Sequence, residues 1–423
     1  MSPVDRRNFL KGSLTALGAG GAGAAVGLAS AERAHAAPTQ DLATASRDVN
    51  GRELMQRLPF DAFHQSGIIT PKPAQATVVA LDSVAPNRTA LVEGLQAISA
   101  EARQLTAGVA VGVAEIDDPP PDSGILGSYN APDSLSVTVG FGASLFDGRY
   151  GLAANRPPHL TPMPAFALDE LDPTRTGGDV ILQICAGQRD TVVHTVRELM
   201  RAVAGKLTIR WMLDGFQTAV RDANPKATTR NLFAFRDGTA NPDVNDPAKM
   251  DEFVWVKAAA GEPAWTTGGS YMVARTIRQH VEFWDRVGML EQEQMIGRYR
   301  VSGAPLGGTY EHEDPRFDLD PKGDRIPLDA HIRLANPRTP KTAHQRILRR
   351  GYNYHRGVDS AGNLDQGLMF IAFNQDPARQ FATIQKRLNN EPMVDYITPV
   401  GGGYFFVPRG TRSAADWIGS ALA

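Results

Sequence analysis

The chain has 423 residues, of which 42% are hydrophobic and 21% are charged. This composition supports large hydrophobic cores and excludes an intrinsically disordered protein, so we expect one or two globular domains. Its 46 acidic and 44 basic residues leave a formal net charge of −2. Because the two signs are interspersed, no basic face or acidic tail predicts a nucleic acid or a membrane surface as a partner.

Cys185 is the only cysteine, and it lies in the apolar run VILQICAGQ. We expect it to be a small buried hydrophobic residue. A single cysteine excludes an internal disulfide, and the absence of a C-x-x-C-H pattern excludes a covalently attached c-type haem. Any haem must therefore be held non-covalently.

The N-terminus carries the pattern of a removable export signal. Arg6 and Arg7 open the run RRNFLK, which precedes a stretch rich in glycine and alanine, and the tripeptide AHA at 34–36 offers a cleavage site. The stretch is shorter and less apolar than the roughly 20 residues that a membrane-spanning helix needs. We therefore expect residues 1–36 to be a twin-arginine signal peptide that directs the chain to a periplasm or out of the cell.

The next part of the chain alternates between strand and helix patterns, after an irregular lead that ends near residue 66. Short β-branched or alternating runs predict strands, and apolar residues three or four positions apart predict helices. The expected order is a strand at 76–81, a helix carrying Leu91, Leu95, Ile98 and Ala102, strands at 135–140 and 180–186, a helix carrying Val192, Val196, Leu199 and Val203, and a strand at 207–212.

The second half repeats this order. Asp376 and Pro377 provide an N-cap and a first-turn proline for its last helix. The expected elements are a strand at 271–276, a helix with Phe283, Val287 and Leu290 on one face, strands near Tyr352 and at 368–373, a helix carrying Phe381, Ile384 and Leu388, and a strand at 404–407.

Both halves match the split β-α-β order of ferredoxin-like folds. We expect an α+β protein with two ferredoxin-like domains built on antiparallel sheets, at residues 60–220 and 226–423 and joined near residues 215–230. The same pattern of elements also fits another α+β arrangement.

Nine histidines compete as ligands for a metal or a haem, and no H-E-x-x-H or other zinc pattern is present. His312 lies in the acidic run EHED, where we expect a solvated or charge-paired side chain. His194 and His280 lie on or beside amphipathic helices, where a histidine is usually a surface or satisfied core residue. His331 differs because it opens the polar run HIRLANPR, which is followed by two arginines at 349–350. A structural loop remains an alternative for this run.

A second polar cluster, FRDGTANP at 235–242, has the glycine and proline punctuation of a tight turn. Such a turn can leave backbone N–H groups and Asp237 facing a cavity. Composition alone favours the simpler interpretation, in which Asp237 caps the turn by bonding to its own backbone.

These segments resemble motifs of the dye-decolourising (Dyp-type) haem peroxidases, most closely the subgroup that includes exported deferrochelatase/peroxidases. The matching segments are FRDGTANP, HIRLANPR, ILRRGYNY at 347–354 and DYITPVGGGYFFVP at 395–408. Four separated segments in the right order, with the expected export signal and the doubled fold pattern, extend the resemblance over essentially the whole mature chain.

The resemblance implies one non-covalent haem b per chain, held mainly by the C-terminal domain. It makes His331 the proximal iron ligand, Asp237 the acid and base on the distal side, and Arg349 its cationic neighbour. It makes Asp395 the carboxylate that accepts the second N–H of the proximal histidine. It places further haem contacts at Gly238, Thr239, Ala240, Asn336, Pro337 and Arg338.

One position departs from the family pattern. The distal motif of the family is G-x-x-D-G, and this chain has Ala234 in place of the first glycine. If that position needs a positive φ, we expect alanine to shift the loop or to cost on the order of 1 kcal/mol. Asp237 and Gly238 remain, so we expect activity to be retained.

The implied activity is that of a peroxidase, which reduces H2O2 and oxidises dyes, phenolic or other bulky reductants in one-electron steps. The alternative is a deferrochelatase that releases iron from haem and keeps the porphyrin intact. A non-catalytic haem carrier would need neither Asp237 nor Arg349, and a secreted binding module would need no cofactor.

The expected partners follow from these activities. They are H2O2 and a reducing substrate, with iron-uptake components for the deferrochelatase alternative. We also expect a homo-oligomer, no nucleic acid and no stable membrane span.

Overall fold

The computed structural model describes residues 46–222, 224, 226–258 and 261–422. The expected signal peptide lies outside them. In this part of the chain, no helix is long and apolar enough to cross a membrane.

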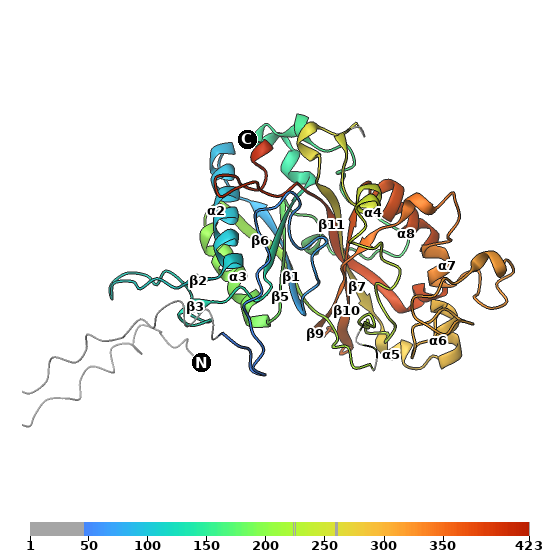
Figure 1. Cartoon of the computed structure of the whole chain (residues 1–423). Helices are drawn as coiled ribbons and strands as arrows, with labels where there is room; N and C mark the ends of the chain where they lie inside the picture. The colour runs from blue at the N-terminus through green and yellow to red at the C-terminus, as the bar shows by residue number, and fades with distance from the viewer. Residues whose placement is uncertain (1–45, 223, 225, 259–260, 423) are drawn as a thin grey trace, which may run out of the picture.

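The N-terminal half forms a four-stranded antiparallel sheet in the order β4-β5-β1-β6, with two helices on its outer face (Figure 1). This arrangement is ferredoxin-like, and it confirms the expected sequence of strands and helices. The elements are β1 (Gln75–Ser83), α2 (Arg88–Ala107), β4 (Ser136–Gly142), β5 (Val180–Ala186), α3 (Arg189–Ala202) and β6 (Leu207–Phe216).

The C-terminal half repeats the arrangement with the order β9-β10-β7-β11. Its strands are β7 (Ser270–Gln279), β8 (Leu348–Arg349), β9 (Tyr352–Val358), β10 (Leu364–Asn374) and β11 (Ile397–Val407). Its helices are α4 (Pro247–Phe253), α5 (Val281–Trp284), α6 (Met289–Ile296), α7 (His331–Ala335) and α8 (Thr383–Leu388), the last preceded by a π-helical turn (Ala378–Ala382).

The two sheets meet along both edges. Phe216 of β6 pairs with Asn353 of β9, and β11 pairs with β4 through Phe405 and Phe406. Successive side chains of β1 point to opposite faces of the sheet, so they pack into two different hydrophobic cores. Val79 belongs to the core under α2 and α3, whereas Val78 belongs to the core between the sheets. Cys185 is fully buried in that second core, as expected.

The helix expected around Phe283, Val287 and Leu290 was predicted wrongly. The chain forms two short helices, α5 and α6, with Gly288 in an extended conformation before α6. Phe283 and Leu290 are exposed, and Val281 and Trp284 are the buried residues of α5. The break at Gly288 changes which side chains face the core.

A small hairpin extends the N-terminal half beyond α2 and α3 (Figure 1). Its strands are β2 (Val109–Ala110) and β3 (Tyr129–Asn130), and a loop at 111–128 joins them. The sequence analysis did not predict it, because two-residue strands leave no periodic pattern.

Candidate active site

A cavity lined by most of the expected site residues lies in the C-terminal half. A segment at 231–241, which we call the distal loop, lines one part of it, and α7, α8, β7 and β10 supply other walls. Its volume, including the open mouth, is about 1650 Å³. Its walls combine apolar side chains with a few charged and polar ones, which is the usual lining of a cofactor site.

Asp237 and Arg349 meet at this cavity, as the sequence analysis expected. The Nη1 atom of Arg349 lies 3.1 Å from Oδ1 of Asp237, and both side chains are partly buried. Asp237 comes from the distal loop, whereas Arg349 lies on β8, beside β10. The capped-turn interpretation of Asp237 is therefore not needed, because its carboxylate pairs with a distant arginine.

Backbone contacts fix the distal loop in a specific shape. Ala234 has φ of 68° and Gly238 has φ of 105°. The side-chain oxygen of Asn231 accepts hydrogen bonds from the N–H groups of Phe233 and Phe235, which holds the turn around Ala234. The family glycine position thus does need a positive φ, and alanine occupies it under strain.

Glu311 is hydrogen-bonded to the distal loop, a contact that the sequence analysis did not predict. It accepts a hydrogen bond of 2.8 Å from the Thr239 hydroxyl and another from the Thr228 hydroxyl. Its neighbour His312 is exposed, as expected. Glu311 is the one buried residue of the run EHED, and composition alone does not single it out.

His331 also lines the cavity, on helix α7. Its Nδ1 atom lies 2.6 Å from Oε2 of Glu391, whose side chain is 2% exposed. The ring N–H at Nδ1 donates to the carboxylate, which leaves Nε2 as the nitrogen available to a metal.

The sequence analysis expected Asp395 as the partner of His331, but the partner in the structure is Glu391. Asp395 is exposed and lies four residues further along a 3₁₀ turn (Pro392–Tyr396). Glu391 is the first carboxylate after α8, whose Ile384 and Leu388 line the cavity, but the sequence alone does not show that it reaches His331.

Two arginines, one in α7 itself and one in α8, hold the short helix α7 in place. Arg333 donates to a carboxylate oxygen of Asp320 at 2.7 Å. Arg387 of α8 donates to the carbonyl oxygens of Leu334 and Ala335 at 2.9 and 3.2 Å. The Arg387 contacts satisfy carbonyl groups that the end of α7 leaves unpaired. Both arginines hold the helix that carries His331.

The remaining expected contacts divide into two groups. Thr239, Ala240, Asn336 and Arg338 line the cavity, whereas Gly238 and Pro337 are not among its lining residues. Burial lowers the pKa of a further cavity residue, Arg298, to about 10, and the nearby charge of Arg338 acts in the same direction. The cavity is rich in positive charge. Its arginines are Arg236, Arg298, Arg338, Arg346, Arg349 and Arg387.

Comparison with known proteins places the chain in one family. The family model described as "Dyp-type peroxidase, N-terminal" matches residues 65–217, and that described as "Dyp-type peroxidase, C-terminal" matches residues 228–412. A protein named deferrochelatase from Yersinia pseudotuberculosis is 42% identical over 96% of this chain and 93% of its own length. Its namesake from Escherichia coli K12 is 44% identical over 92% of both chains.

Solved structures agree with these sequence relatives. The DyP-type peroxidase of Cellulomonas bogoriensis is 36% identical, covers 87% of this chain and 98% of its own, and superposes with a TM-score of 0.77. Ferric DtpA of Streptomyces lividans is 33% identical, covers 87% and 97%, and superposes with a TM-score of 0.78. With both halves of its fold matched, the chain belongs to the Dyp-type peroxidase family.

Proposed function

We propose that this protein is a haem-b peroxidase that reduces H2O2 and oxidises dyes, phenolic or other bulky reductants in one-electron steps. One observation carries the proposal: the pair Asp237 and Arg349 and the pair His331 and Glu391 line the same cavity. Family membership supports this assignment.

The donor set of the cavity fits a haem. His331 offers its Nε2 atom to iron, while its Nδ1 atom is hydrogen-bonded to Glu391. This hydrogen bond makes the imidazole a stronger electron donor to iron. The arginines supply charge complementary to two propionates, with Arg338 as the expected contact. Apolar walls suit the porphyrin faces, and they include Phe235, Ile277, Ile332, Leu368, Phe370 and Ile384.

Asp237 is proposed as the proton carrier. A haem bound by these residues would supply the redox chemistry that takes up the oxidising equivalents of the peroxide. The carboxylate of Asp237 would accept the proton from one peroxide oxygen and deliver it to the other oxygen, which leaves as water. Arg349 stabilises the charge that develops as the O–O bond breaks, because a guanidinium stays protonated and presents fixed donors.

The second half of the cycle restores the resting enzyme. Two reductant molecules each give up one electron, and two protons are consumed, so that one H2O2 yields two molecules of water. The reductant needs no bond to the protein, which is compatible with a wide range of dyes and phenols.

Steady-state kinetics of the haem-loaded protein test the proposal. Asp237→Asn removes the proton carrier at nearly constant volume, and we expect kcat/KM for H2O2 to fall by roughly 10²–10⁴-fold. His331→Ala should weaken haem binding itself, measured by titration. A wild-type protein that binds haem but oxidises no phenolic dye with H2O2 would overturn the assignment.

Iron release from haem is a second candidate, favoured by the name deferrochelatase that relatives of 42–44% identity carry. In this reaction two protons must replace the iron on the porphyrin nitrogens. Asp237 is the proposed source because it lines the cavity and, unlike the other lining carboxylate Glu391, is not engaged by His331. Incubation with haem should then yield metal-free protoporphyrin, detected by its fluorescence, and Asp237→Asn should reduce the yield. No porphyrin above a His331→Ala control would exclude this activity.

The export route rests on the N-terminal sequence. We propose that the twin arginines Arg6 and Arg7 direct the chain out of the cytoplasm, to a periplasm or beyond. Replacing both with lysine should leave the protein inside spheroplasts, as judged by cell fractionation. Release of the variant at the wild-type level would contradict the proposal.

A further inference from the structure

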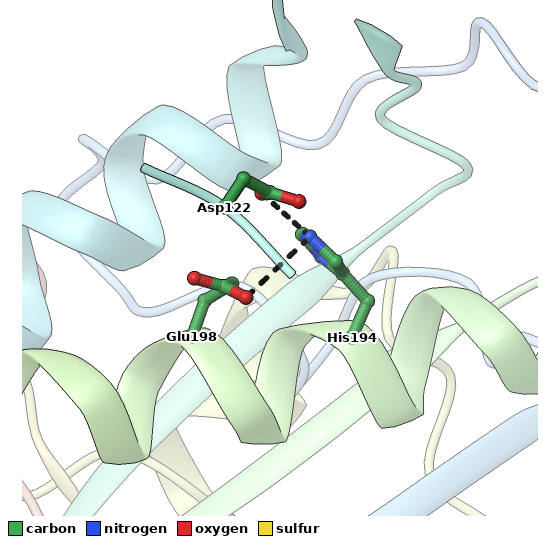
Figure 2. Close-up of side chains that lie close together, drawn as sticks. All are labelled: Asp122, His194 and Glu198. Carbon is green, nitrogen blue, oxygen red and sulfur yellow. Dashed lines mark hydrogen bonds and ion pairs between the residues drawn. The ribbon is translucent and has the colours of Figure 1, made fainter. Parts of the chain in front are cut away.

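Three ionisable side chains converge far from the candidate active site, on the outer side of the N-terminal half. His194 and Glu198 lie one turn apart on α3, and Asp122 comes from the hairpin loop (Figure 2). The Nε2 atom of His194 is 2.8 Å from Oδ2 of Asp122 and 4.0 Å from Oε1 of Glu198. One nitrogen and two carboxylate oxygens therefore lie within 4.8 Å of one another.

The cluster is buried and carries excess negative charge. The side chains of His194, Glu198 and Asp122 are 1%, 5% and 10% exposed. Glu101 of α2 adds a fourth group, and its pKa is raised by burial and then by the charge of Glu198. Arg201, which lies 2.6 Å from Oε2 of Glu198, is the cation paired with that carboxylate. Three carboxylates thus face one arginine and a histidine.

A buried amide oxygen at the cluster has no partner. Asn130 of β3 is 3% exposed, and its Nδ2 atom donates to Oδ2 of Asp122 at 2.9 Å, so the amide reaches into the cluster. Its Oδ1 atom is buried and accepts no hydrogen bond. Leaving such an oxygen unsatisfied costs on the order of 1–3 kcal/mol, so the site is polar but incomplete as it stands.

We propose that Asp122, His194 and Glu198 bind a divalent transition-metal ion of the Zn²⁺ type, with Asn130 as a fourth ligand after its amide rotates by half a turn. The rotation brings the orphaned Oδ1 to the position that Nδ2 occupies, where a cation replaces the amide proton. An imidazole among anionic oxygens suits such ions better than Ca²⁺ or Mg²⁺, which prefer oxygen ligands alone.

The distances are close to those that an ion needs. The three ligand atoms lie within 4.8 Å of one another. Zinc–ligand bonds of about 2.0–2.2 Å at a tetrahedral angle place ligand atoms roughly 3.4 Å apart. Binding therefore requires Asp122 to move away from His194 and Glu198 to move toward the other two side chains. The far oxygens are already held, because the N–H of Gly124 donates to Oδ1 of Asp122 and Arg201 donates to Oε2 of Glu198. Such outer contacts orient metal ligands.

The bound ion would fasten the hairpin loop to α3. Asp122 and Asn130 belong to the hairpin, whereas His194 and Glu198 belong to the helix. This inference does not rest on the proposed peroxidase function.

Metal analysis of the tag-free, haem-loaded protein tests the site. After treatment with EDTA and dialysis, titration with ZnCl2 should give one Zn²⁺ per chain by calorimetry and by elemental analysis. Glu198→Gln and Asp122→Asn keep the size of each side chain, and each should weaken binding by at least roughly tenfold. Zn²⁺ should also slow proteolytic cleavage within the hairpin loop of the wild type alone.

His159→Gln is the matched control, because His159 lies 3.5 Å from Asp376 outside the cluster. It should bind Zn²⁺ as the wild type does. Circular dichroism spectra check that each variant is folded. Absence of stoichiometric Zn²⁺ in the wild type, or binding that survives both cluster substitutions, would overturn the proposal.

Discussion

The side chain of Asn241 pairs with both backbone polar groups of Arg349. Its Nδ2 donates to the Arg349 carbonyl oxygen at 2.8 Å, and its Oδ1 accepts from the Arg349 N–H at 3.1 Å. These two bonds tie the distal loop to β8. The 3.1 Å contact between Asp237 and Arg349 therefore depends on Asn241, which is not itself a member of the pair.

Asn241→Ala should loosen this alignment without removing either member of the pair. We expect kcat/KM for H2O2 to fall by about tenfold, because misplacing catalytic groups by a fraction of an ångström is costly, and stability to fall by about 1–3 kcal/mol. Steady-state kinetics and urea unfolding measure the two effects. Asn245→Ala, at an exposed position four residues after the distal loop, is the control and should change neither. An unchanged kcat/KM in Asn241→Ala would refute the positioning role.

Glu391 should set the electron donation of His331. Glu391→Gln replaces the carboxylate with a neutral acceptor, so the ferric state loses stabilisation and the Fe(III)/Fe(II) reduction potential should rise. Spectroscopic potentiometry of the haem-loaded protein measures this. Asp395→Asn provides the contrast, because Asp395 is exposed, and it should leave the potential unchanged. The reverse ranking of the two variants would restore Asp395 as the partner.

Lys72 should impose a pH dependence on stability. Burial lowers its pKa from 10.5 to about 8, and Asp237 opposes part of this shift. Between these values the unfolded chain binds the proton more tightly than the folded protein, so this group makes stability rise with pH from about 8 to 10.5. Below pH 8 the cost of burying the charged amine is fully present.

Lys72→Met retains the apolar stem and removes the charge. We therefore expect it to raise stability at pH 7, with an advantage that shrinks steadily above pH 8. Urea unfolding of both proteins from pH 7 to 10 measures the difference. A difference that stays constant with pH would show that Lys72 does not titrate in this range.

Ala234→Gly should relieve the strain at φ of 68°. Glycine adopts this conformation without a Cβ clash but loses more entropy on folding, so the expected net gain is up to about 1 kcal/mol. Ala248→Gly, within helix α4, should instead lose about 1 kcal/mol. Thermal unfolding compares the two. Equal losses in both variants would mean that the loop imposes no strain on Ala234.

Much of the fold could be predicted because its strands and long helices follow simple periodic patterns. β5 matches its expected range, and α2 carries its buried stripe at the expected spacing. The short helices α5 and α6 could not be predicted in this way, because a break at Gly288 rearranges a face that looks continuous in sequence. The boundary between the two domains, expected near residues 215–230, stays a prediction.

Motifs led to Asp237, His331 and Arg349, which do line one cavity, and their roles stay predictions. Other parts of the site were missed where three-dimensional packing decides. Glu391 and Glu311 act through contacts with residues 60 and 72 positions away, respectively. No local pattern specifies such pairs, because they depend on how α7, α8 and the loops pack together.

The rate of the optical change on mixing with H2O2 tests the central claim most directly. Haem-loaded wild-type protein and Asp237→Asn are mixed with one equivalent of H2O2 in a stopped-flow instrument, and the Soret band is followed. We expect a one-to-one haem complex whose band changes rapidly in the wild type and at least roughly 100-fold more slowly in Asp237→Asn. Equal rates in the two proteins, or a wild type without a Soret band, would contradict the account.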